Sequence, residues 1–353
     1  MKTWQLLKQQ PRLFQRYFVK EYLIKGIRSF FEKRKYHELE SPILTDALPQ
    51  ERYLDVLETE ISLKDAPSKK KILAYLIPST ETFNKKILAA GLGAHFVISK
   101  VFRGLEAIGP NHSHEFTMCE WYHPQANYFD LMADCENLIL ELKRFLDLKF
   151  RKKRSNEITF QQQIIDLTPP WPRIKVADAL KQFAGLNLKG IEKLSVLQKV
   201  ARFRGYKIDD KDDWQGIFEL IFLNEVEPFL PANKPYFLYD YPKIMCPLAK
   251  TNSKNPLVSE KVELFIVGKE IANGYTEQLD AQKQLEVFLK EQAARKKLGK
   301  KAIKIDKDLI AALKSGLSNV AGIGMGIDRL AMIFADAKNI SEVNYFPANE
   351  MFQ

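Results

Sequence analysis

Apolar residues recur three and four positions apart in several long segments of the chain. Residues 11–35 show this spacing with basic residues between the apolar ones, which predicts an amphipathic helix packed on a core. The same spacing predicts helices from about 128 to 150 and from about 328 onward. Residues 176–229 predict several short helices joined by polar turns.

Strands are predicted where β-branched and aromatic residues cluster between turn signals. HFVISKVFR (95–103) and EFTMCEWYHP (115–124) flank a polar loop, which predicts an antiparallel hairpin. Further strands are predicted in HELESPILTDAL (37–48), at the start of KKILAYLIPSTETFNKKILAAGLG (70–93) ahead of a helix, and in KPYFLYDYP (234–242), KVELFIVGKEIANGY (261–275) and AGIGMGI (321–327). Antiparallel strands with helices gathered in separate segments favour an α+β fold.

No repeat, low-complexity linker or break in composition divides the 353 residues. This length would suit one large domain or two ordinary ones, and the even composition favours a single domain over residues 1–353. We expect that domain to carry a helical insertion at about 176–230 and a basic loop at KEQAARKKLGKK (290–301).

Charge and cysteine usage narrow the class of protein. Fifty-four Lys and Arg against 44 Asp and Glu give a formal charge of +10. This favours an acidic partner such as a nucleic acid, a nucleotide or an acidic protein, although a solvated basic surface would give the same excess.

Cys119, Cys135 and Cys246 lack CxxC spacing and cannot all pair, so neither a disulfide framework nor a zinc site is predicted. Without an apolar leader or an apolar run of ~20 residues, we expect a cytoplasmic protein that is neither secreted nor embedded in a membrane.

Two glutamates flank a predicted turn in VELFIVGKEIANGYTE (262–277). If the chain turns near Gly268, with either VG or GK as the two turn residues, Glu263 and Glu270 project from the same face of the hairpin. Two carboxylates on one face repel each other unless a positive charge lies between them. They therefore predict a hard-cation site, typically Mg²⁺ with phosphate oxygens, with a solvated sheet face as the alternative.

Glycines alternate in AGIGMGIDRL (321–330). Gly322, Gly324 and Gly326 fall on one face of the predicted strand and leave it without side chains, which would allow close approach of a flat ligand or tight packing against another element. Arg329 follows in the first turn of a helix, where a cation gains nothing from the helix dipole. An arginine there predicts an anion such as phosphate, which a guanidinium can hold through two hydrogen bonds.

The hairpin at 95–124 brings varied chemistry to one surface. Period two places Arg103 on one face of the first strand and Phe116, Glu120 and Tyr122 on one face of the second. An arginine, an aromatic ring, a carboxylate and a phenol suit a ligand that has a phosphate, a flat base and an amine. In the loop, His112 is a candidate for contact with ATP or a solvated residue rather than a zinc ligand.

These segments together resemble a known family, the class II aminoacyl-tRNA synthetases, and within it the lysyl branch. FRGLEAIGPNHSHEFTMCEWY (102–122) is similar to the family's second motif, GIGMGIDRLAMIF (322–334) to its third, and YHELESPIL (36–44) more faintly to its first. The likeness runs from about Leu13 to Pro347. It implies a class II catalytic domain, an antiparallel β-sheet flanked by helices. Pro42 stands at the position of the first motif's proline, which implies a homodimer.

The resemblance also implies roles for individual residues, with ATP and Mg²⁺ as cofactors. Arg103 and Arg329 would be catalytic, holding the α- and γ-phosphates, while Phe116 would stack on adenine. Residues implied to bind ATP are Arg103, Glu106, His112, Phe116, Glu270, Ile271, Gly326 and Arg329. Residues implied to bind the amino acid are Ser79, Glu81, Glu120, Tyr122, Asn273, Glu277 and Gly324. Glu263 and Glu270 would hold Mg²⁺.

The chain departs from the family pattern in the loop of the second motif. An Arg-Asn-Glu run is replaced by Arg103, Gly104, Leu105 and Glu106, so one inserted residue brings Glu106 into the glutamate's role. The loop's usual second arginine is Asn111. Gly324 matches the glycine of the synthetases where the β-lysine ligases tend to carry alanine, so both lysine and β-lysine stay open as substrates.

The implied activity is that of an ATP-dependent, AMP- and pyrophosphate-forming ligase. A lysyl-tRNA synthetase carries an anticodon-binding domain ahead of its catalytic core, and we expect none here because a dozen residues precede the first predicted helix. That arrangement resembles the ligases that attach β-lysine to a lysine of elongation factor P, which we take as the expected acceptor. The alternatives are a truncated synthetase that charges tRNA and a non-catalytic regulatory paralogue.

Overall fold

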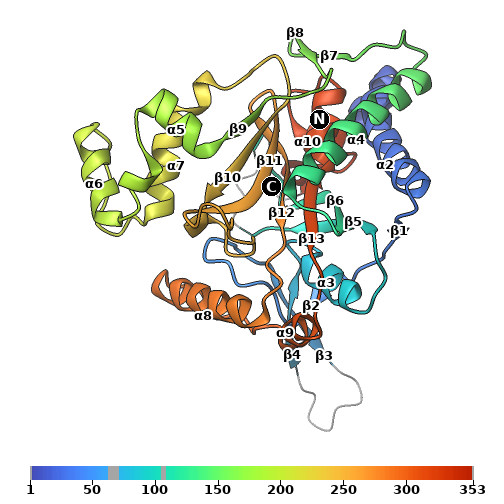
Figure 1. The fold of residues 1–353 in the computed structure, drawn as a ribbon. Helices are drawn as coiled ribbons and strands as arrows, with labels where there is room; N and C mark the ends of the chain where they lie inside the picture. Colours follow the sequence, from blue (N-terminus) through green and yellow to red (C-terminus); the bar gives the residue numbers. More distant parts are fainter. Residues whose placement is uncertain (1, 63–70, 105–108, 352–353) are drawn as a thin grey trace.

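The fold is built around a large, mostly antiparallel sheet (Figure 1). The computed structural model describes residues 2–62, 71–104 and 109–351. Within these ranges the sheet has eight strands. Their spatial order is β1 (His37–Glu38), β5 (His95–Phe102), β6 (Glu115–Pro124), β13 (Val320–Gly326), β12 (Lys269–Thr276), β11 (Val258–Ile266), β10 (Tyr236–Pro242) and β9 (Arg173–Lys175). The outer pairs β1–β5 and β9–β10 are parallel, and the inner pairs are antiparallel.

Long helices pack on one face of this sheet and bury the main core. They are α2 (Phe14–Lys33), α4 (Tyr128–Lys149) and α10 (Ile327–Phe334). The apolar stripe of α2, including Leu23 and Ile27, is fully buried against α4 and the sheet. α4 is capped by Asn127, whose side chain accepts a hydrogen bond from the Phe129 N–H, as Asn does at favourable helix starts. This layer leaves the opposite face of the sheet for the site.

A second hydrophobic cluster joins the helical insertion to the sheet. Helices α5 (Val176–Ala184), α6 (Leu194–Phe203) and α7 (Trp214–Glu225) pack on one another and on strands β10 and β11. They stand to one side of the sheet in Figure 1. The insertion thus forms one side wall beside the strands that carry the candidate site.

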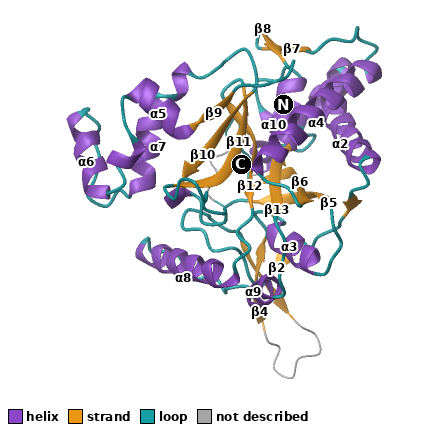
Figure 2. Cartoon of the chain, viewed as in Figure 1, coloured by secondary structure: helices purple, strands orange, loops and turns teal. Residues whose placement is uncertain are grey.

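A second wall comes from a smaller sheet and three helices. Strands β2 (Leu44–Thr45), β4 (Lys71–Leu76) and β3 (Glu58–Ser62) pair antiparallel. Figure 2 shows helices α3 (Glu81–Ala89), α8 (Ala281–Lys297) and α9 (Lys307–Lys314) on this side. Elements that do not line the site are α1 (Thr3–Gln9), the hairpin β7 (Glu157–Phe160) and β8 (Gln163–Asp166), and α11 (Ala348–Met351).

Most predicted elements are confirmed, and the α+β class with them. The structure has the helix predicted over 11–35, the 95–124 hairpin, the strands at 234–275 and the helices of the insertion. The prediction of a basic loop at 290–301 is wrong, because residues up to Lys297 belong to α8. That helix forms because Phe288 is buried and because Glu291 and Arg295 are also buried against a neighbouring segment, so its charged residues are not all solvated.

Two expectations from composition can be compared with the described residues. No helix in those ranges is long and apolar enough to cross a membrane. Cys119, Cys135 and Cys246 are free thiols inside the protein. Burial raises the pKa of each thiol above its usual value.

Strands β12 and β13 approach so closely that one glycine is required. A Cβ atom at Gly274 would lie 2.4 Å from Cβ of Ile323 and 2.6 Å from the carbonyl oxygen of Gly322. Because both atoms belong to the rigid centre of the sheet, neither can move aside cheaply.

We expect Gly274→Ala to lower the free energy of unfolding by about 3 kcal/mol, through overpacking. The measurement is urea unfolding followed by circular dichroism. Gly216→Ala is the control: it lies in α7, its Cβ would be 3.6 Å from the nearest atom, and it should match or slightly exceed the wild type. Equal stability of Gly274→Ala and the wild type would contradict this account of the strand contact.

Candidate active site

A cavity of about 720 Å³ opens over strands β6, β13 and β12. Its floor is the glycine face of β13, as the alternation of Gly322, Gly324 and Gly326 predicted. A Cβ at Gly322 would lie 2.3 Å from Oε1 of Glu277, whereas a Cβ at Gly326 would meet nothing closer than 3.9 Å. The floor is therefore already filled by neighbouring side chains at one end and open at the other.

At the filled end a buried lysine joins two carboxylates. The Lys85 ammonium is 2.6 Å from Oε2 of Glu277 and also pairs with Glu81, one turn earlier in α3. Lys85 is 1% exposed. Burial alone lowers the pKa of Lys85, but Glu277 and Glu81 outweigh it and the pKa is raised. The lysine thus stays charged and holds both carboxylates in place.

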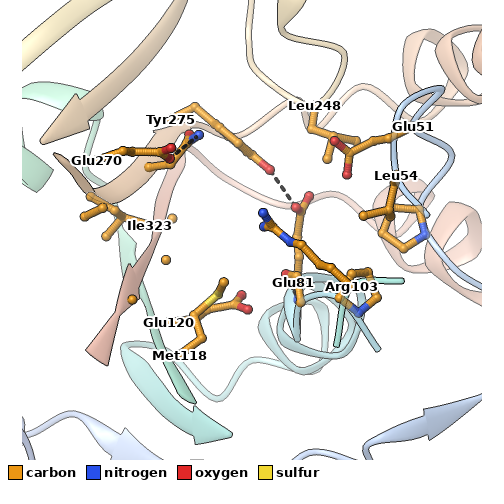
Figure 3. A pocket seen from close by; sticks show the side chains of 18 of the residues that line it. Glu51, Leu54, Glu81, Arg103, Met118, Glu120, Leu248, Glu270, Tyr275 and Ile323 are labelled. Carbon is orange, nitrogen blue, oxygen red and sulfur yellow. Dashed lines mark hydrogen bonds between the residues drawn. The ribbon is translucent and has the colours of Figure 1, made fainter. Parts of the chain in front are cut away.

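The same end holds more carboxyl groups than ammonium groups. Burial raises the pKa of Glu277 to about 8, Lys85 opposes that rise, and Glu81 adds to it. Tyr275 donates its hydroxyl to Oε2 of Glu81 at 2.6 Å, which fixes the second oxygen of that carboxylate (Figure 3). Positive charge entering here would relieve the repulsion among the carboxylates.

Glu120 completes the acidic end from β6. It accepts a hydrogen bond from the Thr80 N–H at 2.7 Å, and the Tyr122 hydroxyl lies 3.3 Å from its other oxygen. Burial raises the pKa of Glu120, while the hydrogen bonds from Thr80 and Ser79 lower it. Phe116, Glu120 and Tyr122 lie on one face of β6, as period two predicted.

At the open end of the floor the lining becomes basic and aromatic. Arg103 follows β5, and its guanidinium carbon lies 5.4 Å from the centroid of the Phe116 ring, a cation–π contact. Arg329, in the first turn of α10, donates to the carbonyl oxygens of Glu270 at 2.9 Å and Asn111 at 3.2 Å. An arginine beside an aromatic face, with a second arginine nearby, suits a nucleotide with its phosphates.

The carboxylates of Glu263 and Glu270 meet around one amide. Nδ2 of Asn273 lies 3.1 Å from Oε1 of Glu263 and 3.3 Å from Oε1 of Glu270. The turn residues are Val267 and Gly268, both with positive φ, so the VG alternative is correct. A bulge at Ile271 then brings Asn273 opposite Glu263, in place of Ala272.

This pair fits a magnesium ion. Burial, and next the charge of Glu263, raise the pKa of Glu270, while Arg329 and Lys261 oppose the rise. Glu263 is paired with Lys261 at 2.8 Å, whereas Arg329 lies 3.8 Å from Oε2 of Glu270, so the charge of Glu270 is the less compensated of the two. In the described part of the chain no group of three or more His, Cys, Asp or Glu side chains gathers as a metal site, so a cation here would complete its coordination with phosphate oxygens or water, as Mg²⁺ commonly does.

The cavity gathers nearly all the residues named from the sequence. Those that line it are Ser79, Glu81, Arg103, His112, Phe116, Glu120, Tyr122, Glu270, Ile271, Asn273, Glu277, Gly324, Gly326 and Arg329. Glu263 lines an adjoining cavity of about 480 Å³, which it shares with Glu270 and Arg329. Glu106 lies outside the described residues. The residues that line the two cavities therefore lie together in the structure, and the roles assigned to them stay predictions.

The structure adds site residues that the sequence reasoning missed. Lys85 could have been found from its position four residues after Glu81 on one helix face. Tyr275 alternates with Asn273 along β12, which is also a sequence signal. Glu51 lines the cavity from a segment without regular structure, and no periodicity could have identified it.

The mostly antiparallel sheet with helices on one face and a cavity over its glycine strand is the architecture of a class II tRNA synthetase domain. Comparison with protein families agrees: residues 3–350 match the model described as tRNA synthetases class II (D, K and N). The chain belongs to this family.

Individual relatives carry two different names. The chain is 33% identical over 345 residues to lysine–tRNA ligase of Trichormus variabilis, covering 96% of this chain and 57% of that protein. It is 32% identical over 332 residues to elongation factor P–(R)-β-lysine ligase of Mannheimia succiniciproducens, covering 94% of each. Lysine–tRNA ligase of Carboxydothermus hydrogenoformans is 32% identical over 343 residues, which cover 66% of that protein. The chain therefore spans little more than half of some of these relatives and nearly all of others.

With lysine as the substrate that the family resemblance implies, we expect Lys85→Met to weaken lysine binding and to move its pH dependence. A carboxylate must be ionised to bind an ammonium, so lysine affinity should rise as pH increases through the Glu277 pKa of about 8. Lys85 favours the ionised form, and its loss should shift the profile upward by at least about one pH unit. The measurement is the KM for lysine in pyrophosphate exchange between pH 6 and 10.

Lys85→Arg keeps the charge and should restore most of the normal profile, which separates the electrostatic effect from simple loss of packing. An unchanged pH profile in Lys85→Met would show that Lys85 does not set the ionisation of Glu277.

The two ends of the glycine floor should respond differently to a methyl group. Gly322→Ala forces Cβ against Glu277 and, at 2.6 Å, against the Tyr122 ring, so we expect the KM for lysine to rise about tenfold or more. Gly326→Ala has open space and should retain the lysine KM while raising the KM for ATP. Steady-state exchange kinetics with each substrate varied test this, and a rise in lysine KM for both variants would contradict the division of the floor.

Proposed function

We propose that this chain activates lysine or β-lysine with ATP to form an aminoacyl-adenylate and transfers the aminoacyl group to a lysine side chain of elongation factor P. One observation carries the first half: a single cavity holds three buried carboxylates at one end and two arginines with an aromatic ring at the other, across a floor without side chains. The carboxylates are Glu81, Glu120 and Glu277.

The acidic end suits a substrate with two ammonium groups. A neutral amino acid would leave buried carboxylates without a counter-charge, whereas lysine supplies a positive charge for each end of its own chain. Lys85 keeps Glu81 and Glu277 in position without entering the cavity lining. Selectivity for a diamino acid then follows from electrostatics, with the bare surface at Gly324 accommodating the backbone of the substrate.

Activation requires no nucleophilic side chain. An oxygen of the substrate carboxylate attacks the α-phosphorus of ATP, and pyrophosphate leaves. Arg103 would neutralise charge on the α-phosphate, Arg329 would hold the γ-phosphate, and Phe116 would stack on the base. Glu263 and Glu270 would hold Mg²⁺, which supplies charge neutralisation at the phosphates when bound.

Two findings support elongation factor P as the acceptor. Relatives named elongation factor P–(R)-β-lysine ligase align over 94% of their length and of this chain. The +10 charge suits an acidic acceptor. tRNA is the second candidate, favoured by the relatives named lysine–tRNA ligase and by glycine at position 324. We further propose that the protein is cytoplasmic and forms a homodimer. Analytical ultracentrifugation would test the dimer.

Exchange between ATP and pyrophosphate with lysine, (R)-β-lysine and neutral amino acids tests activation. Exchange dependent on lysine or β-lysine is expected, and no amino-acid-dependent exchange would overturn the proposal. Transfer of labelled amino acid to elongation factor P and to tRNA tests the acceptor. Transfer to tRNA alone would replace the protein acceptor by RNA and leave the activation step standing.

Glu277→Gln should raise the KM for lysine at least about 30-fold, because a hydrogen bond to a charged group contributes ~2 kcal/mol. It should also abolish the rise in affinity near pH 8, since glutamine cannot ionise. Glu60→Gln is the control, because Glu60 lies on β3 with a well-exposed side chain that pairs with Lys71. Normal lysine selectivity in Glu277→Gln would rule out the assigned pocket.

A further inference from the structure

Residues 49–55 form a rim segment that lines the cavity between β2 and β3. Side chains of α8 hold its outer side through hydrogen bonds. Arg52 pairs with Glu291, with Nε 3.0 Å from Oε2. Arg295 donates to the carbonyl oxygens of Glu51 at 2.7 Å and Leu54 at 2.6 Å. Charge-assisted hydrogen bonds of this kind hold a backbone in place although it has no regular structure.

Two further elements fix the other side of the rim segment. Gly104 donates its N–H to the carbonyl oxygen of Asp55 at 2.9 Å, which ties the segment to the loop after β5. The Tyr53 hydroxyl donates to Asp213, the residue that caps the N-terminus of α7. The rim segment is therefore bound to the helical insertion, to α8 and to the strand end that carries Arg103.

Glu51 directs its side chain from this segment into the cavity. Figure 3 shows its carboxylate beside Leu54 and Leu248, on the side that faces Glu81 and Arg103. Across the described ranges, no residue donates a hydrogen bond to this carboxylate. The charges that act on it are those of Glu81, Arg103, Lys261 and Glu291, and Arg295 contacts its backbone. Burial, followed by the charge of Glu81, raises the pKa of Glu51.

The other cavity carboxylates are already engaged, and this distinguishes Glu51. Glu277 pairs with Lys85, Glu120 accepts from Thr80, and Glu270 lies against Asn273. In the proposed reaction Glu81 binds the amino acid and Arg103 holds the α-phosphate. The reacting carbonyl of the adenylate would lie between those two groups, and Glu51 lines the same cavity on the side that faces both of them.

We propose that Glu51 is the catalytic residue of the transfer step: its carboxylate binds the incoming alkylammonium group of the acceptor and takes a proton from it. This inference rests on the proposed function, which supplies an amine as acceptor. The neutral amine then attacks the adenylate carbonyl, a carbon–nitrogen bond forms, and the bond from that carbon to the phosphate oxygen breaks. AMP leaves with the bonding electron pair, and the second proton of the nitrogen passes to its phosphate or to water.

The position of Glu51 explains how a carboxylate can act as the base in the transfer step. A general base is effective when its pKa approaches the working pH, and burial at the rim moves the Glu51 pKa in that direction. A rigid rim segment also aligns the acceptor with the carbonyl, which reduces the entropic cost of the second step. Activation of the amino acid needs no such base, so Glu51 should affect the two half-reactions unequally.

The experiment separates those half-reactions in Glu51→Gln. Enzyme-bound adenylate is formed from labelled lysine and ATP with pyrophosphatase, and its loss is followed after addition of elongation factor P or of hydroxylamine. Hydroxylamine is unprotonated at neutral pH and needs no base. We expect lysine-dependent exchange and capture by hydroxylamine to stay within about threefold of wild type, and transfer to elongation factor P to fall about 100-fold.

Other outcomes overturn the proposal. If Glu51→Gln lost lysine-dependent exchange as well as transfer, Glu51 would belong to amino-acid binding or to folding. Equal slowing of the reactions with elongation factor P and with hydroxylamine would exclude a role as base. Unchanged transfer to elongation factor P would exclude any role of Glu51 in that step. Glu60→Gln should leave both half-reactions unchanged. A wild-type protein without lysine-dependent exchange would refute the proposed function itself, a result seen before any variant is compared. Wild-type capture by hydroxylamine without transfer to elongation factor P would refute the acceptor.

Discussion

The buried ammonium of Lys85 fixes the geometry on which the cavity depends. It joins Glu81 on α3 to Glu277, just beyond the end of β12, and so ties the smaller side of the fold to the central sheet. Burying a carboxylate without a partner costs several kcal/mol, and here two carboxylates share one cation. The remaining negative charge is directed into the cavity, where it can bind a cationic substrate. One interaction thus serves both the packing of the fold and the selectivity of the pocket.

Strand β13 lets the two chemistries of the site share one cavity. Because it presents glycines to the cavity, carboxylates from β6 and α3 and arginines from α10 and from the residue after β5 can face the same space without side chains between them. The near contact of a Cβ at Gly322 with Glu277 shows how little room the acidic end has to spare. An amino acid and a nucleotide placed along this floor would meet near its middle, where carboxylate and α-phosphorus must react.

Much of this organisation can be predicted from the sequence. The 95–124 hairpin, the shared face of Phe116, Glu120 and Tyr122, and the glycine face of β13 all follow from period two, because strand geometry places alternate residues on one side. The basic stretch at 290–301 led the same reasoning to the wrong prediction of a loop. Its Glu291 and Arg295 are paired with the rim segment in three dimensions, so charge did not indicate a solvated loop.

The sequence by itself determined the α+β class, most strands of the sheet and the residue types of both ends of the site, because these depend on local periodicity and on short motifs. Only the tertiary structure decided that a bulge at Ile271 places Asn273 between Glu263 and Glu270, that Lys85 bridges Glu81 and Glu277, and that Glu51 reaches the cavity. Each of these depends on contacts between segments far apart in the chain. Strand register after a bulge and the path of an irregular segment are set by packing and hydrogen bonds, and local sequence does not encode them.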